Sequence, residues 1–409
     1  MKDIIFLPWR DIHNYRKEGF RVREGNIIKS FSDRHDVRKI LIINRAKNLK
    51  SIINKSTTGM EIKTEIWPNK KLVSTFWGSR LYEIQENMFS LELPVCFFNK
   101  GDNVLENSVI FQYYLKLIIK KTTRFLKIDL NSNKTWVWSS DLSRAFVFKW
   151  LNETKLNCKK IFDTIDNLVQ HKAYTVKQRN RNEKRYQIID ENADIIFSVS
   201  KANLGTLYKK RSDQKYFIEN GINIERFNNT EAPLMKNNEK IICGYIGVIE
   251  SRINFELLIE LAMKTPQIEY HLVGPVLNNE DVVIQALRKQ ENVKFIGAVS
   301  FEEVPTIIKS FDICIIPHVI NMFTCSMSPL KFYEYLAANK PIIMTQVPPA
   351  ESVNKLNGVY VANTVEEWLV AIEKISVEKT IDLENDTERQ LLVQKHSWNK
   401  IVEKMVNCI

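Results

Sequence analysis

The chain has 409 residues, of which 44% are hydrophobic and 26% charged, and this composition excludes a mostly disordered chain and favours two or three globular domains. Glycine is scarce, at 12 residues, and neither a P-loop nor a classical dinucleotide-binding fingerprint occurs. Lys and Arg outnumber Asp and Glu by 41 to 23 up to Lys215, whereas the remainder has 18 against 25. The basic half is therefore expected to face nucleic acid, a membrane surface or a phosphorylated substrate.

Other global features narrow the class of protein further. No run of about 18 uncharged apolar residues occurs, so we expect no membrane-spanning helix, and Met1–Leu7 lacks the features of a signal peptide. The six cysteines lie far apart without a Cys-x-x-Cys pair, which favours reduced thiols in a cytosolic protein. Histidines do not cluster with Cys or acids at metal-binding spacing, so we predict no metal site.

In the first half of the chain, short apolar runs alternate with amphipathic stretches, a pattern typical of βα units and parallel sheets. Helices are predicted over residues 21–35 and 110–127. Strands are predicted over Ile4–Leu7, Lys39–Asn44, Thr135–Trp138, Lys160–Thr164 and Ile195–Ser198.

The sequence pattern of the first half ends near residues 216–230. A short strand over Phe217–Ile222 is expected to close on an Asn-Gly turn, and the polar segment 228–238 to form a linker. Strands are then predicted over Ile241–Ile246, Glu269–Val273, Val293–Ile296, Ile313–Ile316, Pro341–Met344 and Gly358–Val361, with helices at about 254–264, 280–289, 302–309 and 329–338.

These elements predict an α/β protein with two doubly wound parallel-sheet domains. The expected boundaries are 1–220 for the first domain, 221–380 for the second and 381–409 for a C-terminal helical tail. The tail either caps its own domain or packs back across the first. Ligands of such sheets bind at the carboxyl ends of the strands, and the space between two such domains is the default active site.

The segment from Ser328 to Pro341 contains the residues best suited to binding a ligand. It predicts a helix with Ser328 as N-cap and Pro329 at the first position, and the N-terminus of such a helix attracts anions. Lys331 lies in the first turn, where a cation is unfavourable unless a bound diphosphate offsets it. Glu334 shares that face and could accept hydrogen bonds from ribose hydroxyls. The alternative is an ordinary Lys–Glu surface pair.

The stretch from Ser328 to Ile343 (SPLKFYEYLAANKPII) resembles the signature of the donor-binding domain of family-4-like GT-B glycosyltransferases. Cys243–Ile249 (CGYIGVI), His271–Pro275 (HLVGP) and Asn292–Gly297 (NVKFIG) are similar to other parts of that domain. Asp163–Asp166 and Glu219–Ile222, followed by Phe227, resemble the end of the acceptor domain and its linker. The likeness covers roughly 135–345, is weak before 130, and is greatest to bacterial cell-surface polysaccharide enzymes of the teichuronic-acid type.

The resemblance implies two Rossmann-like domains that face each other across a cleft, and transfer of a sugar from a nucleoside diphosphate to a hydroxyl of a growing, lipid-linked bacterial surface glycan. The implied hexosyltransferase is retaining and metal-independent, with no tightly bound cofactor. A UDP-sugar is the first expected donor and a GDP-sugar the second. The implied donor-binding residues are Glu334, Ser328, Pro329, Leu330, Gly247, Gly274, Val299, Thr324 and Ser326.

Catalysis would require cations near the leaving diphosphate, a role implied for Lys331 and Arg252. Asp163, at a strand end, is a candidate acceptor-side catalytic residue, with a helix cap or surface carboxylate as the alternative. His318 also ends a strand and is either catalytic or a packed neighbour. Two positions depart from the family pattern, because Ser326 replaces a glutamate and Val248 an arginine.

The basic half suggests a second partner. Phe111–Lys127 reads as a basic amphipathic helix that could lie on the anionic inner face of the plasma membrane, making the protein cytoplasmic and peripheral. The alternative is a core helix with snorkelling lysines. The run Lys177–Arg185 is expected to be a solvated helix face, and we expect no nucleic-acid partner. Two competing hypotheses stay open: a catalytically weakened scaffold that binds sugar nucleotides or partners, and a nucleic-acid-binding protein.

Overall fold

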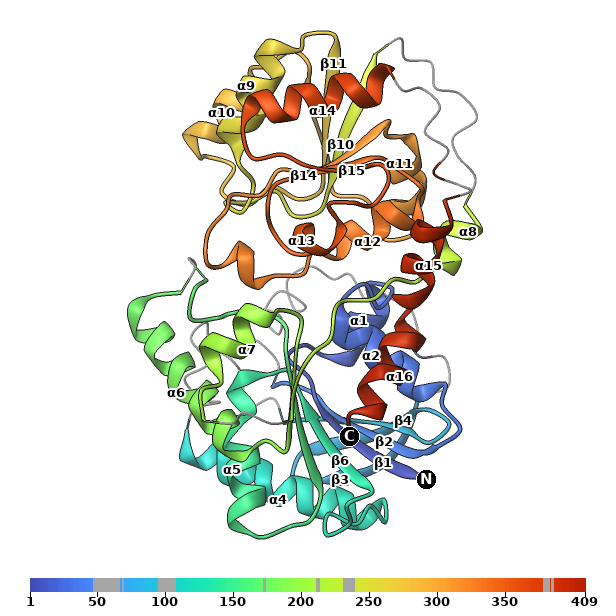
Figure 1. The fold of residues 1–409 in the computed structure, drawn as a ribbon. Coiled ribbons are helices and arrows are strands. Elements are labelled where there is room, and N and C mark those ends of the chain that lie inside the picture. The colour runs from blue at the N-terminus through green and yellow to red at the C-terminus, as the bar shows by residue number, and fades with distance from the viewer. Residues whose placement is uncertain are drawn as a thin grey trace, which may run out of the picture. The chain divides into compact units, whose positions relative to one another are not determined.

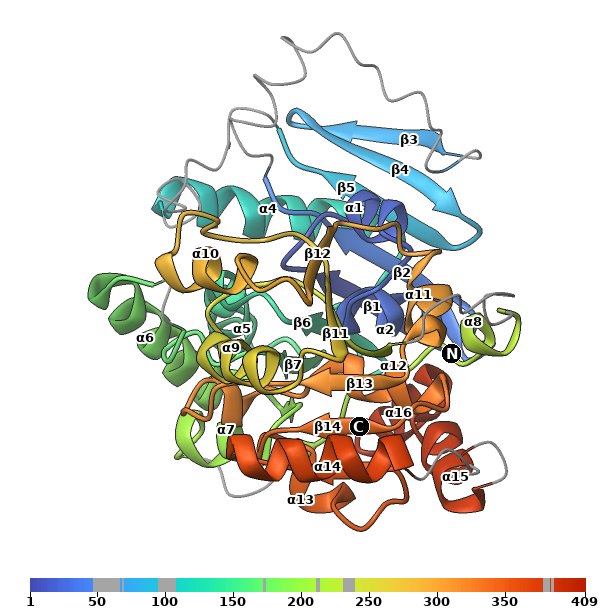
Figure 2. The ribbon, with the colours of Figure 1, turned by 90° about the horizontal axis from the view of Figure 1, so that it is seen from above.

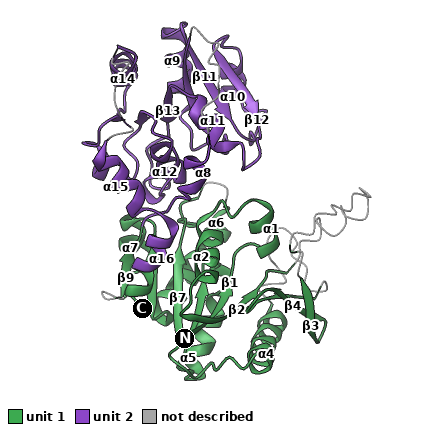
Figure 3. Cartoon of the chain, turned by 90° about the vertical axis from the view of Figure 1, so that its right-hand side faces the viewer, with its two compact units in different colours: residues 1–218, 405–409 green, residues 219–404 purple. Residues whose placement is uncertain are grey.

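The computed structural model describes residues 1–46, 67, 70–94, 108–171, 174–210, 214–230, 240–377, 383 and 386–409. The chain divides into two compact units (Figure 3). Unit 1 comprises Met1–Ile218 and Met405–Ile409, and unit 2 comprises Glu219–Lys404. Each unit is built around a β-sheet of its own.

The sheet of unit 1 has the strand order β3-β4-β5-β2-β1-β6-β7-β8-β9. The pairs β3–β4 and β4–β5 are antiparallel, and the other pairs are parallel. Figure 2 shows the β3–β4 hairpin at one edge. The strands are β1 (Lys2–Leu7), β2 (Val37–Ile43), β3 (Lys71–Phe76), β4 (Ser79–Gln85), β5 (Met88–Glu92), β6 (Thr135–Ser139), β7 (Lys159–Thr164), β8 (Ile195–Ser198) and β9 (Lys215–Phe217).

Helices flank this sheet, and side-chain caps define where several of them begin. The Ser108 hydroxyl accepts a hydrogen bond from the Phe111 N–H at 3.1 Å at the start of α4, and Thr175 with Gln178 forms a capping box at the start of α6. The α-helices of unit 1 are α1 (Ile12–Lys17), α2 (Arg23–Ser32), α4 (Val109–Phe125), α5 (Ala145–Glu153), α6 (Val176–Asn192) and α7 (Lys201–Leu207).

Aromatic side chains fill much of the core on one face of the unit 1 sheet. Trp138 stacks on Phe197 with ring centroids 5.5 Å apart, and Phe31 of α2 meets Trp138 edge-on, also at 5.5 Å. Because the central strands are parallel and covered on both faces, they read as nearly continuous apolar runs rather than as alternating ones. That pattern is the reason the sequence predicted them.

Unit 2 has a six-stranded, fully parallel sheet with the order β12-β11-β10-β13-β14-β15. The direction of winding reverses between β10 and β13, which makes their carboxyl ends the topological switch point of a doubly wound fold. Its strands are β10 (Ile241–Ile246), β11 (Ile268–Val273), β12 (Val293–Gly297), β13 (Ile313–Ile316), β14 (Ile342–Met344) and β15 (Val359–Val361).

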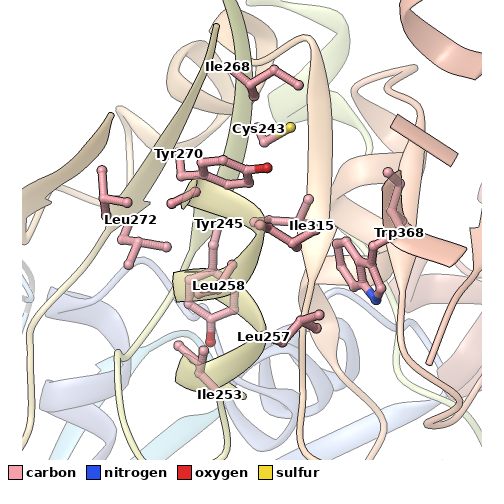
Figure 4. Close-up of a cluster of buried hydrophobic side chains, with 14 of the residues drawn as sticks. Cys243, Tyr245, Ile253, Leu257, Leu258, Ile268, Tyr270, Leu272, Ile315 and Trp368 are labelled. Atoms are coloured by element: carbon pink, nitrogen blue, oxygen red, sulfur yellow. The ribbon is translucent and has the colours of Figure 1, made fainter. Parts of the chain in front are cut away.

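Helices α9 and α14 bury one face of this sheet (Figures 1 and 4). Tyr245 and Tyr270 from β10 and β11 pack with Leu258 of α9, and the buried Trp368 of α14 donates from Nε1 to the Ala362 carbonyl at 2.9 Å. The α-helices after β9 are α8 (Glu225–Asn228), α9 (Phe255–Lys264), α10 (Val282–Arg288), α11 (Val304–Ser310), α12 (Leu330–Ala337), α13 (Ala350–Val353), α14 (Val365–Val377), α15 (Thr387–Lys395) and α16 (Trp398–Asn407), whose last residues belong to unit 1.

The predicted α/β class with two parallel-rich sheets is confirmed, and two local predictions are wrong. The strand expected over 217–222 ends at Phe217, and Ile222 pairs only in an isolated bridge with Ser397. Gly221 does not form a hairpin turn, because it packs closely under Trp398, where a Cβ would lie 2.7 Å from the indole ring. The expected linker at 228–238 begins at the end of α8, and residues 231–239 lie outside the described part of the chain.

Candidate active site

Two glycines bring the loops after β10 and β11 into close contact in unit 2. Gly247 and Gly274 have φ values of +140° and +139°, and a Cβ on Gly274 would lie 2.0 Å from the Gly247 carbonyl oxygen. The Gly247 N–H donates to the Val273 carbonyl at 2.8 Å. Only glycine permits this approach, so the two predicted donor-site glycines let the backbones of these loops touch at the carboxyl edge of the sheet.

Helix α12 begins one residue later than expected, which corrects the predicted cap. Pro329 occupies the N-cap position and Leu330 is the first helical residue, with no side-chain hydrogen bond capping the helix. Ser328 is therefore not the N-cap, and its carbonyl accepts a hydrogen bond from Asn220 Nδ2 at 2.7 Å. The helix is instead tied to the sheet by Tyr335, whose phenol oxygen accepts from the Ile246 N–H at 3.1 Å.

The ammonium group of Lys331 lies beside Gly247, in the loop after β10. Its Nζ lies 4.7 Å from the centroid of the Tyr245 ring, and a Cβ on Gly247 would be 3.5 Å away from it. Burial and, to a smaller extent, the charge of Arg252 lower the pKa of Lys331 to about 7, and Glu334 opposes this shift. A bound anion would restore the lost solvation of the charged form, so the lysine is suited to a diphosphate.

Glu334 lies one turn after Lys331, and burial raises the pKa of its carboxyl group, against the opposing charges of Arg226 and Lys331. Arg226, on α8, stacks its guanidinium on the Phe301 ring at 3.4 Å and donates to the Phe301 carbonyl. The sequence reasoning missed Arg226, although it stands directly before Phe227 in a stretch that carried the resemblance.

Arg252 approaches the same edge from the loop after β10. Its guanidinium forms an ion pair with Glu250, and the two side chains are 24% and 17% exposed. Glu250 was also missed, because nothing in its spacing distinguishes it from a surface carboxylate. This ion pair holds the Arg252 side chain in place, and Glu250 partly compensates its positive charge before any ligand binds.

His318 follows β13 and is only 1% exposed. Burial lowers the pKa of its imidazole well below the usual value, and the neighbouring charges of Lys331 and Arg252 act in the same direction. The ring is therefore neutral at physiological pH, and it meets Tyr245 edge-on with ring centroids 6.3 Å apart.

Three other residues that were predicted to contact the donor use their side chains for contacts within the protein. The Thr324 hydroxyl donates to the Val319 carbonyl and the Ser326 hydroxyl to the Phe323 carbonyl, both at 2.6 Å, and each residue is at most 2% exposed. Val299 packs half-buried against the core. Thr324 and Ser326 thus stabilise the loop before α12 by hydrogen bonds within that loop. Val248, which stands where the family has an arginine, is exposed and uncharged.

The catalytic role expected for Asp163 does not fit its geometry. Its carboxylate accepts from Arg23 of α2, with Nε to Oδ2 at 2.8 Å and Nη2 to Oδ1 at 3.0 Å, and both side chains are 1% exposed. Asp163 is thus half of a buried ion pair. Asp141, just after β6, caps the short 3-10 helix Leu142–Arg144, because its side chain accepts from the Ser143 N–H at 2.9 Å.

Unit 1 contains a second buried carboxyl group that the sequence reasoning missed. Glu24 accepts hydrogen bonds from the Tyr15 and Ser140 hydroxyls and, at 3.2 Å, from the Trp9 N–H. Burial raises its pKa to about 8 despite these donors. Glu24 thereby links the segments that follow β1 and β6.

Within the described ranges, no three His, Cys, Asp or Glu side chains are grouped so as to hold a metal ion. Among the helices of that same part of the chain, none is both long enough and apolar enough to cross a membrane.

Two Rossmann-like units, one with cations and a carboxylate gathered at the carboxyl edge of its sheet, define the GT-B class of glycosyltransferases. The sequence of residues 227–390 matches the family "Glycosyl transferases group 1". Of the solved structures, sucrose-phosphate synthase from Thermosynechococcus elongatus has a TM-score of 0.66 at 15% identity, with 100% of this chain and 98% of that chain covered. HepE from Anabaena, in complex with UDP, has a TM-score of 0.65 at 14% identity, with 100% and 99% covered.

One curated relative is the putative teichuronic acid biosynthesis glycosyltransferase TuaH of Bacillus subtilis, strain 168. It is 29% identical over 203 residues, which are 47% of this chain and 50% of the relative. The match thus spans about half the length of this curated relative.

The buried position of Asp163 generates a stability prediction. We expect Asp163→Asn to lower the free energy of unfolding by about 3–5 kcal/mol, because it leaves the Arg23 charge buried and uncompensated. Glu191→Gln is the control, since it breaks a pair with Lys210 whose side chains are 45% and 63% exposed, and we expect no measurable loss of stability. Thermal unfolding followed by calorimetry measures both, and equal stability of the two variants would contradict the structural role.

Proposed function

We propose that this protein transfers a sugar from a nucleoside diphosphate to a hydroxyl group of a bacterial cell-surface glycan. The observation that carries the proposal is the grouping of Lys331, Arg252 and Glu334 beside the close approach of Gly247 and Gly274. Backbone loops without side chains leave room for a diphosphate, the cations compensate its charge, and the carboxylate can accept from ribose hydroxyls.

In the reaction, the bond between the anomeric carbon and the diphosphate oxygen breaks, and a bond to the acceptor oxygen forms. The acceptor proton leaves with the departing diphosphate. Negative charge therefore grows on the diphosphate in the transition state, where Lys331 and Arg252 stabilise it without a metal ion. Retention of the anomeric configuration stays a prediction.

Proteins similar to this chain support a particular class of donor and of acceptor. HepE has been solved with UDP and with UDP-glucose, which supports a UDP-sugar as the first donor to test and a GDP-sugar as the second. The curated relative is assigned to teichuronic acid biosynthesis. A growing, lipid-linked anionic glycan is therefore the acceptor class that we propose.

Donor binding tests the proposal directly. We expect Glu334→Ala to weaken binding of a UDP-sugar by about 1–3 kcal/mol, because ribose hydroxyls and Arg226 lose their partner. Glu373→Ala, which removes an exposed carboxylate from α14 in the same unit, should leave the dissociation constant unchanged. Isothermal titration calorimetry with UDP- and GDP-sugars measures both variants.

Two outcomes would favour the competing hypotheses. Donor binding without release or transfer of sugar to any of several lipid-linked acceptors would support a weakened scaffold. Salt-sensitive binding of random oligonucleotides, with no nucleotide sugar bound, would support a nucleic-acid-binding protein.

The pKa of Lys331 generates a pH prediction. With a pKa of about 7 in the free protein, Lys331 is largely neutral at pH 8–9, and an anionic ligand must recruit a proton to it. We expect affinity for a UDP-sugar to be full below pH 7 and to fall by up to about tenfold for each pH unit above 7. Lys331→Arg keeps the charge without titrating, so its affinity should stay flat up to pH 9, and an equal slope in both proteins would rule out Lys331 as the cause.

A lipid-linked acceptor requires a membrane surface, and unit 1 offers one candidate. Val109, Ile110 and Tyr113 at the start of α4 are 80%, 74% and 64% exposed, and Trp77 in the β3–β4 turn is 59% exposed. Tyr114 ties the two elements together, because its hydroxyl donates to the Trp77 carbonyl at 3.1 Å. Exposed cations, Lys121 and Arg124, lie further along the same helix.

Exposed aromatic and aliphatic side chains beside cations fit an anionic bilayer better than a neutral one. We expect Lys121→Glu combined with Arg124→Glu to reduce binding to vesicles containing phosphatidylglycerol at least fivefold in a flotation assay. Lys177→Glu combined with Lys184→Glu makes the same charge change on exposed positions of α6 and should have a smaller effect. Equal losses would show that only net charge matters.

A further inference from the structure

Three buried nitrogen atoms at the carboxyl edge of the unit 2 sheet lack a hydrogen-bond partner among the described residues. They are Nδ1 and Nε2 of His318 and Nε of Arg252. Buried polar atoms are almost always paired, because an unpaired one has lost its solvation without compensation. Unpaired groups that share one place therefore point to a ligand or ordered water that pairs them.

The backbone holds these two residues beside each other. Their parent strands β10 and β13 are neighbours in the sheet, and the pairing continues beyond the strands. The Asn254 N–H donates to the Pro317 carbonyl at 2.8 Å, and the Val319 N–H donates to the Arg252 carbonyl at 2.9 Å. Thr345 adds a hydrogen bond from its hydroxyl to the His318 carbonyl at 2.7 Å. The unpaired atoms thus belong to a rigid part of the fold.

The hydrogen-bonding atoms of His318 limit which kind of ligand group can pair with both of its ring nitrogens. A neutral imidazole presents one N–H donor and one nitrogen acceptor. A phosphate oxygen of a nucleotide sugar accepts only, so it would leave the acceptor nitrogen unpaired. A hydroxyl group both donates and accepts, and a sugar ring carries several of them.

Ser326 supplies a second argument. The family resemblance places a donor-contacting carboxylate at this position, but here the hydroxyl is turned inward to the Phe323 carbonyl and the residue is 2% exposed. The Ser326 side chain is thus not available to a donor. At the same edge of the sheet, both ring nitrogens of His318 and the Nε atom of Arg252 are buried and unpaired, although Nη2 of Arg252 pairs with Glu250.

Resting on the proposed function, we propose that His318, together with Arg252 Nε, binds hydroxyl groups of the transferred sugar. His318 is then a sugar-recognition residue of the donor site. It distinguishes a nucleotide sugar from the free nucleotide, whereas Glu334 binds both.

The experiment compares UDP with UDP-sugars by isothermal titration calorimetry on the full chain. The probes are UDP, UDP-glucose, UDP-galactose and UDP-N-acetylglucosamine, and the sugar nucleotide that binds most tightly is then used with the variants. His318→Phe keeps a buried ring but removes both hydrogen-bonding atoms. We expect its affinity for UDP to stay within twofold of the wild type and its affinity for the UDP-sugar to fall at least tenfold. Glu334→Ala should weaken both ligands alike.

The other outcomes are decisive as well. Equal losses for UDP and the UDP-sugar in His318→Phe would overturn the inference in favour of diphosphate contact, and no loss for either would show that water fills the site. If the wild type binds none of the probes, the proposed function itself fails. Should His318→Phe not fold, monodeoxy analogues of the sugar replace it: at least one should bind the wild type no better than UDP does, and uniform binding of all analogues would overturn the inference.

Discussion

Concentration of positive charge at one edge of the unit 2 sheet is the constraint on which the candidate site depends. Lys331 is buried close to the charge of Arg252, and its pKa falls to about 7, mainly because burial removes the solvation of its charged form and further because Arg252 repels it. The fold holds them there because Tyr335 ties α12 to β10 and because two glycines let the neighbouring loops touch. Such an arrangement costs stability in the free protein and becomes favourable when an anion occupies the edge.

The buried acidic groups of unit 1 are instead satisfied by partners within the protein. Asp163 is fully paired with Arg23, and Glu24 is surrounded by three hydrogen-bond donors. These groups stabilise the strand ends from within and have little capacity left for a ligand. Exposed residues such as Lys121 and Arg124 on α4 carry part of the positive excess of the basic half.

Sequence patterns predicted the parallel strands well and the hairpin strands poorly. The bounds of β10 and β13 were predicted to the residue, because buried parallel strands are short, continuous apolar runs between polar segments. Strand β3, by contrast, is half exposed, so its side chains carry no comparable signal. The start of α12 was misplaced because serine before proline is a frequent helix cap, whereas the Ser328 carbonyl is held by Asn220 from a distant part of the chain.

Lys331 and Glu334 were predicted as site residues from their positions in the helix that follows a strand and a loop, whereas Arg252 was expected only from the family resemblance. Only the tertiary structure decided what each polar group faces. It paired Asp163 with Arg23, turned Ser326 inward, added Arg226 and Glu250, and left the two ring nitrogens of His318 buried without a hydrogen-bond partner among the described residues. The physical reason is that local spacing determines where a side chain starts, whereas its partner and its solvation depend on residues brought together from far along the chain.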